Sequence, residues 1–140
     1  MNREFPYLTA DGRYYTLVRR FRPFSAHRVL RPFVEAYRVV ADALERRPAE
    51  AALDEEAFLR ACMALGQQYV LQRRILSPES VSHVLFATAF SLARNRGLVD
   101  PGAPDLVERR RAFAEELREV TRRVDAIDAL VAARHAGLID

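Results

Sequence analysis

The sequence predicts an all-α fold, a helical bundle of about four principal helices preceded by a short N-terminal β-hairpin or extended arm. Apolar residues recur at intervals of three and four through most of the chain, as they do on one face of a helix. Capping and helix-breaking residues separate these stretches. Of the 140 residues, 50% are apolar and 29% are charged, which is typical of one globular domain.

Residues 1–24 are predicted to form the hairpin or arm, and residues 25–140 the helical domain. The arm contains two stretches rich in aromatic and β-branched residues, 7–9 and 14–18, and Asp11-Gly12 between them suits a tight turn. A two-stranded hairpin is marginally stable alone, so we expect it to lie on the helices or on another part of the protein.

Arginine and phenylalanine are interleaved between Gly12 and Val34, where no acidic residue occurs. An anionic lipid surface attracts such charges by about 1 kcal/mol each. In the alternative, the phenylalanines pack inward and the arginines are solvated or pair with acidic helix faces. The residues predicted to contact a membrane or a partner are Arg19, Arg20, Arg22, Arg28 and Arg31.

The first helix is predicted to begin near Ser25 or Arg31 and to end at Arg47, before Pro48. Pro32 suits a helix only within its first turn, which favours the later start.

The second helix is predicted to begin after Asp54, whose carboxylate can cap it, and to end near Arg73 and Arg74. Gly66 in its interior costs about 1 kcal/mol relative to alanine, which indicates the close approach of a neighbouring helix. Ser77 is predicted to cap the third helix, which ends at Gly97.

The last helix is predicted from residue 104 or 105 to His135, a length of about 45 Å. Its apolar residues are spaced alternately by four and three, as in a coiled coil. Such a seam packs on the other helices, on a catalytic domain or on a second copy of the chain, which would make a homodimer. The seam residues are Phe113, Leu117, Val120, Val124, Ile127 and Val131.

Amide, phenol and guanidinium groups gather where the second helix meets the third. We predict that this cluster docks on another domain, with interhelical bonding and helix capping as the alternative. The predicted docking residues are Gln68, Tyr69, Gln72, Arg73 and Arg74.

Five stretches in this order and spacing carry a resemblance to a known family. They are RPFVEAY (31–37), LGQQYVLQRRI (65–75), SPESVS (77–82), LFATA (85–89) and LARNRGL (92–98). Together they resemble the C-terminal helical region of bacterial, actinobacterial-type, membrane-associated glycerol-3-phosphate O-acyltransferases. The resemblance covers residues 19–100 well and the last forty residues loosely.

The resemblance implies a non-catalytic domain that supports an acyltransferase catalytic domain in the same or a separate chain. The parent enzyme would transfer an acyl group from acyl-CoA or acyl-carrier protein to glycerol 3-phosphate, at the cytoplasmic side of the cell membrane. The family's His and Asp spacing occurs only at His135 and Asp140, at the extreme C-terminus, and we reject it as catalytic. No catalytic residue is therefore predicted, and the chain is expected to be inactive alone.

A different class of function is a stand-alone, soluble interaction module that dimerises through residues 105–135. Other classes lack support in the sequence. The three histidines and one cysteine do not have metal-ligand spacing, so no metal or cofactor is expected. The net charge of +3 is too small to indicate nucleic-acid binding, and the single cysteine suggests a reducing compartment.

Overall fold

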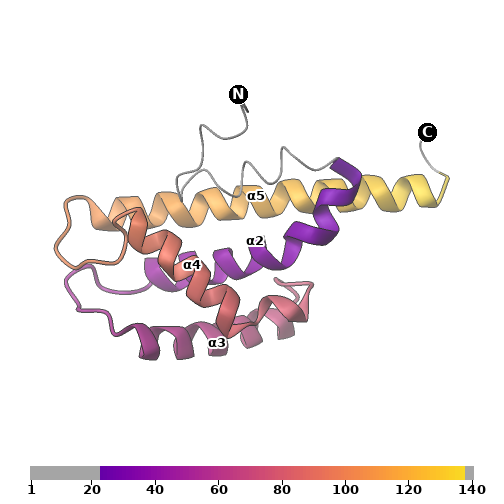
Figure 1. Ribbon diagram of the computed structural model, residues 1–140. Helices are drawn as coiled ribbons and strands as arrows, with labels where there is room; N and C mark the ends of the chain where they lie inside the picture. Colours follow the sequence, from indigo (N-terminus) through magenta and orange to yellow (C-terminus); the bar gives the residue numbers. More distant parts are fainter. Residues whose placement is uncertain (1–22, 138–140) are drawn as a thin grey trace, which may run out of the picture.

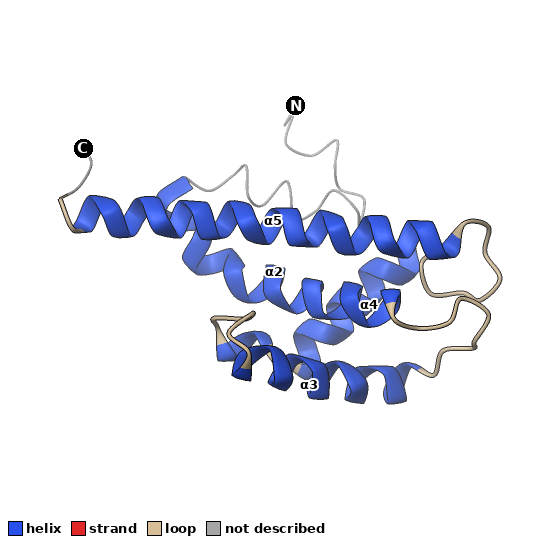
Figure 2. Cartoon of the chain, turned by 180° about the vertical axis from the view of Figure 1, so that it is seen from behind, coloured by secondary structure: helices blue, strands red, loops and turns tan. Residues whose placement is uncertain are grey.

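The computed structural model describes residues 23–137, with side chains from Leu30 onward. It contains α2 (Pro23–Glu45), α3 (Glu55–Leu71), the 3-10 turn η1 (Pro78–Ser80), α4 (His83–Asn95) and α5 (Leu106–His135). Figure 2 shows these helices joined by loops, without a strand in the described range. The predicted helical bundle is thus confirmed. The predicted hairpin falls outside the described residues.

α2 is the element on which the others assemble. It contacts α3, η1, α4 and α5, and in Figure 1 it runs between the long α5 and the pair formed by α3 and α4. Small and branched side chains on several of its faces allow neighbours to approach closely. Those that are at most 9% exposed are Leu30, Val34, Ala36, Val39, Val40, Ala41, Ala43 and Leu44.

The proline in α2 lies in the helix interior, because α2 begins at Pro23 and not at Arg31. The later of the two predicted starts was therefore wrong. An interior proline lacks the N–H donor and its ring clashes with the preceding turn, which bends a helix. Figure 1 shows the indigo N-terminal part of α2 tilted away from the remainder. Packing of Leu30 and Val34, both 3% exposed, stabilises this part.

α3 begins as predicted, since the Asp54 carboxylate accepts a hydrogen bond from the Ala57 amide (3.0 Å). The close approach at Gly66 is also confirmed. A Cβ atom added to Gly66 would lie 3.2 Å from Cζ of Phe86 and 3.2 Å from Cγ2 of Val81. The glycine therefore lets α3 pack directly against the start of α4.

The third predicted helix is split in two. Ser77 makes no capping bond with its side chain, and the turn that follows, Pro78–Ser80, is a short 3-10 helix. α4 begins only after Ser82, whose hydroxyl accepts from the Leu85 amide (3.3 Å). The predicted cap was therefore placed five residues early. The predicted stop is confirmed, because Gly97 has a φ of +74° beyond the end of α4.

α5 has the predicted bounds, and its apolar seam divides into two parts. The first part packs against α2, the element with which α5 makes most of its contacts. The second part lies toward the C-terminal end, which extends beyond α3 and α4 in Figure 1. Dimerisation through this helix stays a prediction. The seam residues that are at most 6% exposed are Phe113, Leu117, Val120 and Val124, whereas Ile127 and Val131 are half-buried.

Among residues 30–137, Arg110 of α5 is the largest fully buried side chain, at 2% exposed. Its guanidinium donates to backbone carbonyls from two segments, namely Leu98 (2.8 Å) and Val99 (3.4 Å) after α4, and Leu44 (3.4 Å) and Arg47 (3.3 Å) at the end of α2. The last carbonyls of a helix lack partners within it and carry partial negative charge. Arg110 thus caps α2 from a helix about 65 residues later in the chain. Burial and the charge of Arg47 lower the pKa of Arg110.

Candidate functional site

The predicted docking residues do not all face solvent. Gln68, Gln72 and Arg73 are exposed at the C-terminal end of α3. Tyr69 is 1% exposed and donates its hydroxyl proton to Asp42 (2.7 Å). Arg74 is exposed but lies over the Tyr69 ring, with its central carbon 5.3 Å from the ring centroid. The cluster is therefore divided into an outward part and a part that is turned back toward α2.

The backbone reverses at Arg73, which has a φ of +60°. α3 therefore ends at Leu71, slightly earlier than predicted, and the two arginines follow it. The amides of Arg74 and Ile75 both donate to the Tyr69 carbonyl (2.9 and 3.3 Å). This turn sends the chain back over the end of α3 and leaves Gln72 and Arg73 at its outer edge.

A buried carboxylate, Glu35 of α2, holds the loop between α3 and α4. It is 1% exposed and accepts from the amides of Leu76 (2.9 Å) and Ser77 (3.1 Å) and from the Ser80 hydroxyl (2.8 Å). Arg31 also donates to it (3.2 Å). A carboxylate buried in this way is compatible with folding because its oxygens are saturated by donors. Glu35 thereby fixes the position of the junction between α3 and α4, residues 71–84, which we call the corner.

Apolar side chains project from this corner into solvent. Leu71 is 84% exposed, Leu76 is 60% exposed and Val84 is 71% exposed. Leu71 also lines a shallow hollow of about 390 Å³, together with Gln67, Val70, Pro78 and Val81. Exposed apolar patches with a polar rim are typical of protein interaction sites.

The basic stretch is only partly within the described residues. Arg19, Arg20 and Arg22 lie outside them, and the side chain of Arg28 does too. Arg31 is 7% exposed, and its guanidinium is bonded to Glu35 of its own helix and to Asp125 (2.8 Å) and Asp128 of α5. Burial opposes the charge of Arg31, but the carboxylates of Asp125 and Asp128 outweigh it and raise the pKa of Arg31. Arg31 therefore joins α2 to α5.

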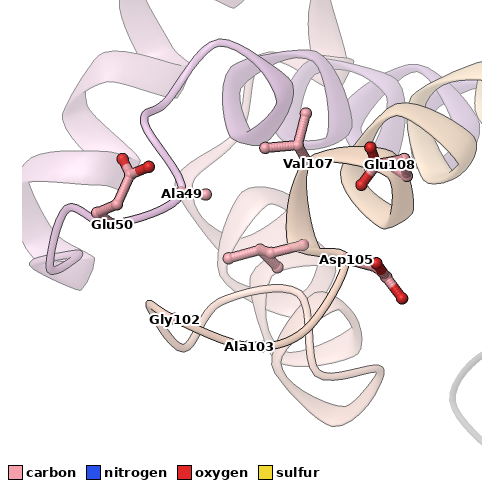
Figure 3. A pocket seen from close by; sticks show the side chains of 8 residues that line it. Ala49, Glu50, Gly102, Ala103, Asp105, Val107 and Glu108 are labelled. Atoms are coloured by element: carbon pink, nitrogen blue, oxygen red, sulfur yellow. The ribbon is translucent and has the colours of Figure 1, made fainter.

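A second hollow, of about 430 Å³, lies between the loop after α2 and the start of α5. Its lining includes the carboxylates of Glu50, Asp105 and Glu108 (Figure 3). Figure 3 shows Glu50 on one side of the hollow and the two other acids on the opposite side. The carboxylates do not converge on one point, so this hollow is a weak candidate for a binding site.

No group of metal-ligating side chains is found within residues 23–137. Cys62 is completely buried in the core between α3 and its neighbours, and burial raises the pKa of its thiol to about 12. The thiol is therefore protonated at neutral pH and unsuited to nucleophilic chemistry. None of the helices in the described range is both long and apolar enough to cross a membrane.

Sequence reasoning missed the two acids that organise this region. Glu35 and Asp42 are 1% and 4% exposed, and they accept most of the long-range hydrogen bonds made to α2. A signal existed, because both interrupt the apolar face of a predicted helix and are seven residues apart, hence on the same side. The exposed Leu71 and Leu76 were also missed, since apolar periodicity describes the buried face of a helix and not the apolar residues that lie outside it.

Comparison with known proteins identifies long relatives. The proteins named "Putative acyltransferase plsB1" in Mycobacterium tuberculosis strain H37Rv and in Mycobacterium bovis are each 50% identical to this chain over 106 residues. The aligned region is 75% of this chain and 17% of each relative. The chain thus matches about a sixth of the length of these relatives. No solved structure matches it significantly.

A family model described as the glycerol-3-phosphate acyltransferase C-terminal region matches residues 7–102. This range includes α2, α3, η1 and α4, and so the Glu35 network and the exposed corner that it holds. The match covers more than half of the chain, and the identity to the mycobacterial relatives agrees with it. The chain therefore belongs to the family of glycerol-3-phosphate acyltransferase C-terminal regions.

Proposed function

We propose that this chain is a non-catalytic helical domain that docks on, and supports, the catalytic domain of a glycerol-3-phosphate acyltransferase. The observation that carries the proposal is the exposed apolar corner formed by Leu71, Leu76 and Val84. Three apolar side chains exposed to water near the junction of α3 and α4 favour association with another surface. Membership of the family of glycerol-3-phosphate acyltransferase C-terminal regions supports a catalytic domain as the proposed partner.

The corner has the features of a preorganised binding surface. The loop that carries Leu76 is bonded to the buried Glu35 through two amides and a serine hydroxyl. Little conformational entropy is therefore lost when a partner binds it. Gln68, Gln72 and Arg73 are exposed at the same end of α3 and can hydrogen-bond at the rim of an interface.

The reaction of the assembled enzyme would be transfer of a fatty acyl group from acyl-CoA or acyl-carrier protein to the sn-1 hydroxyl of glycerol 3-phosphate. This step begins phospholipid synthesis. In the proposed division of labour, the catalytic domain performs the chemistry and the helical domain contributes position and stability. The assembly would work at the cytoplasmic face of the membrane, where its products are used.

Docking can be tested with the double variant Leu71→Asp and Leu76→Asp. The partner is the catalytic region of a mycobacterial relative, prepared without the segment that matches this chain. We expect binding to weaken at least about tenfold, because central apolar contacts dominate interface energies. Acyl transfer to glycerol 3-phosphate by the reconstituted pair should fall in parallel.

The control is Leu130→Asp, which makes one such leucine-to-aspartate substitution at another exposed position, 47% exposed and on α5. It should leave binding and acyl transfer within about twofold of the wild type, as is usual for surface substitutions. Equal loss in the control, or no loss in the double variant, would show that the corner is not the docking surface.

We also propose that the arm contacts anionic lipid through Arg19 and Arg20. Binding to vesicles with anionic lipid should weaken as salt is raised, because exposed charges are screened. The charge reversals Arg19→Glu and Arg20→Glu together should reduce binding at least about tenfold, since each removed contact contributes about 1 kcal/mol. Vesicle binding that is unchanged in the double variant would contradict this proposal.

A further inference from the structure

Three guanidinium groups gather around the buried Tyr69. The central carbons of Arg74 and Arg38 lie 5.3 and 5.7 Å from the centroid of its ring. Nη2 of Arg46 lies 3.4 Å from its hydroxyl oxygen. Arg38 belongs to α2, Arg46 follows the last residue of α2, and Arg74 lies in the loop after α3. Folding therefore concentrates positive charge at a point that is not evident in the sequence.

Within the described residues, two carboxylates balance this charge, and both are shared with Arg118 of α5. Asp42 accepts from the Tyr69 hydroxyl (2.7 Å) and from Arg118 (3.1 Å), and it lies 3.7 Å from Nε of Arg38. Glu45 accepts from Arg118 (2.7 Å). Four guanidiniums thus face two carboxylates, an excess of two positive charges.

Several donors in this cluster remain available. Arg46 and Arg74 are exposed, and neither makes an ion pair with a carboxylate within residues 30–137. Nε of Arg38 is buried and has no hydrogen-bond partner. Asp42 is 3.7 Å away, which is an ion-pair distance but too long for a hydrogen bond. An anion at this cluster would accept from the exposed Arg46 and Arg74.

We propose that Arg38, Arg46 and Arg74 form a binding site for a phosphate monoester. Guanidinium groups match pairs of phosphate oxygens and bind them through two parallel hydrogen bonds. A phosphate monoester carries about −1.5 to −2 charges at neutral pH, which matches the excess of two positive charges. A phosphodiester or a carboxylate carries only one. The site does not depend on the docking proposed above.

Tyr69 has a positioning role in this site. Its hydroxyl is committed as a donor to Asp42, and its ring is the surface on which Arg38 and Arg74 rest. Cation–π contact fixes the orientation of a guanidinium without using its hydrogen-bond donors. The ring contact therefore holds Arg74 without using its side-chain N–H groups, whereas Arg38 also approaches Asp42 and Arg46 donates to the Tyr69 hydroxyl.

The phosphate group has two chemical sources, a small soluble monoester and the headgroup of a phosphatidate-like lipid. The first arm of the test is calorimetric titration of the full chain with inorganic phosphate and with glycerol 3-phosphate, at constant ionic strength. A dissociation constant on the order of 1 mM or lower is expected for at least one of them if the source is soluble. Dimethyl phosphate, a monoanionic diester, should bind at least about tenfold more weakly.

The second arm compares vesicles that contain phosphatidate with vesicles that contain phosphatidylglycerol at equal surface charge. It uses the variant with Arg19→Glu and Arg20→Glu, so that these two N-terminal arginines do not contribute to vesicle binding. Preference for phosphatidate would show that the bound phosphate belongs to a lipid headgroup. Binding in only one arm identifies the source, and binding in neither arm overturns the proposal.

In both arms the decisive variants are Arg46→Gln and Arg74→Gln, with Arg73→Gln as the matched control. All three residues are exposed and each substitution removes one positive charge. We expect at least about tenfold weaker binding for the first two and less than about twofold for the control. Equal losses in all three would show general charge attraction and overturn the site. Unchanged thermal unfolding by circular dichroism would establish that each variant is folded.

Discussion

Replacing Arg110 by methionine is expected to lower the free energy of unfolding by about 3 kcal/mol. The methionine fills much of the same volume, so the loss reflects the backbone carbonyls of Leu44, Arg47, Leu98 and Val99, which would be buried without their donor. The loss should appear as a lower urea midpoint with an unchanged slope, because the folded structure and its buried area are retained.

Arg111→Met is the matched control, since Arg111 is the next residue and is exposed. Its effect on the urea midpoint should lie within about 0.5 kcal/mol. Arg110→Lys should be intermediate, because an ammonium group is a point donor and does not span carbonyls on two sides. Replacement of buried charges by apolar groups is neutral in some proteins. A methionine variant as stable as the wild type would show that replacing Arg110 is neutral too, and it would contradict the role of Arg110 as the cap of α2.

Replacing Glu35 by glutamine is expected to lower the free energy of unfolding by about 3 kcal/mol or more. The carboxylate now accepts from the amides of Leu76 and Ser77 and from the Ser80 hydroxyl. In glutamine, one carboxylate oxygen is replaced by an amide nitrogen, which is a donor. This nitrogen would face one of those three donors and leave it without an acceptor. Arg31 would also lose one of its carboxylate partners. The structural consequence should be local, because the loop between α3 and α4 depends on this residue.

Hydrogen exchange separates this local effect from a general loss of stability. The amides of Leu76 and Ser77 should exchange faster in Glu35→Gln than amides of α5, even at low denaturant. Glu79→Gln is the control, because Glu79 is exposed in the adjacent turn. Since Leu76 belongs to the proposed docking corner, Glu35→Gln should also weaken binding to the catalytic region. Uniform protection across the loop in the variant would show that Glu35 does not hold it.

The helical class, the number of helices and most of their ends follow from local signals in the sequence. Asp54 caps α3 because its side chain reaches an amide three residues away, which spacing alone reveals. Gly97 ends α4 because glycine adopts a positive φ without steric cost. The family followed from several short stretches in one order, and the family match confirms it.

The tertiary structure alone decided which polar groups are buried and what each one bonds. Glu35 and Ser80 are 45 residues apart, and Arg110 and the Leu44 carbonyl are 66 apart. Periodicity cannot detect such pairs, since it describes one helix at a time and not the donors that a neighbour supplies. The same reason explains two wrong predictions. Pro32 was expected in the first turn of its helix but lies in the interior of α2. Ser77 was expected to cap a helix, but its amide is bonded to the distant Glu35. The sequence thus determined the helices, and the buried charges, the exposed corner and the arginine cluster arose only when distant segments packed together.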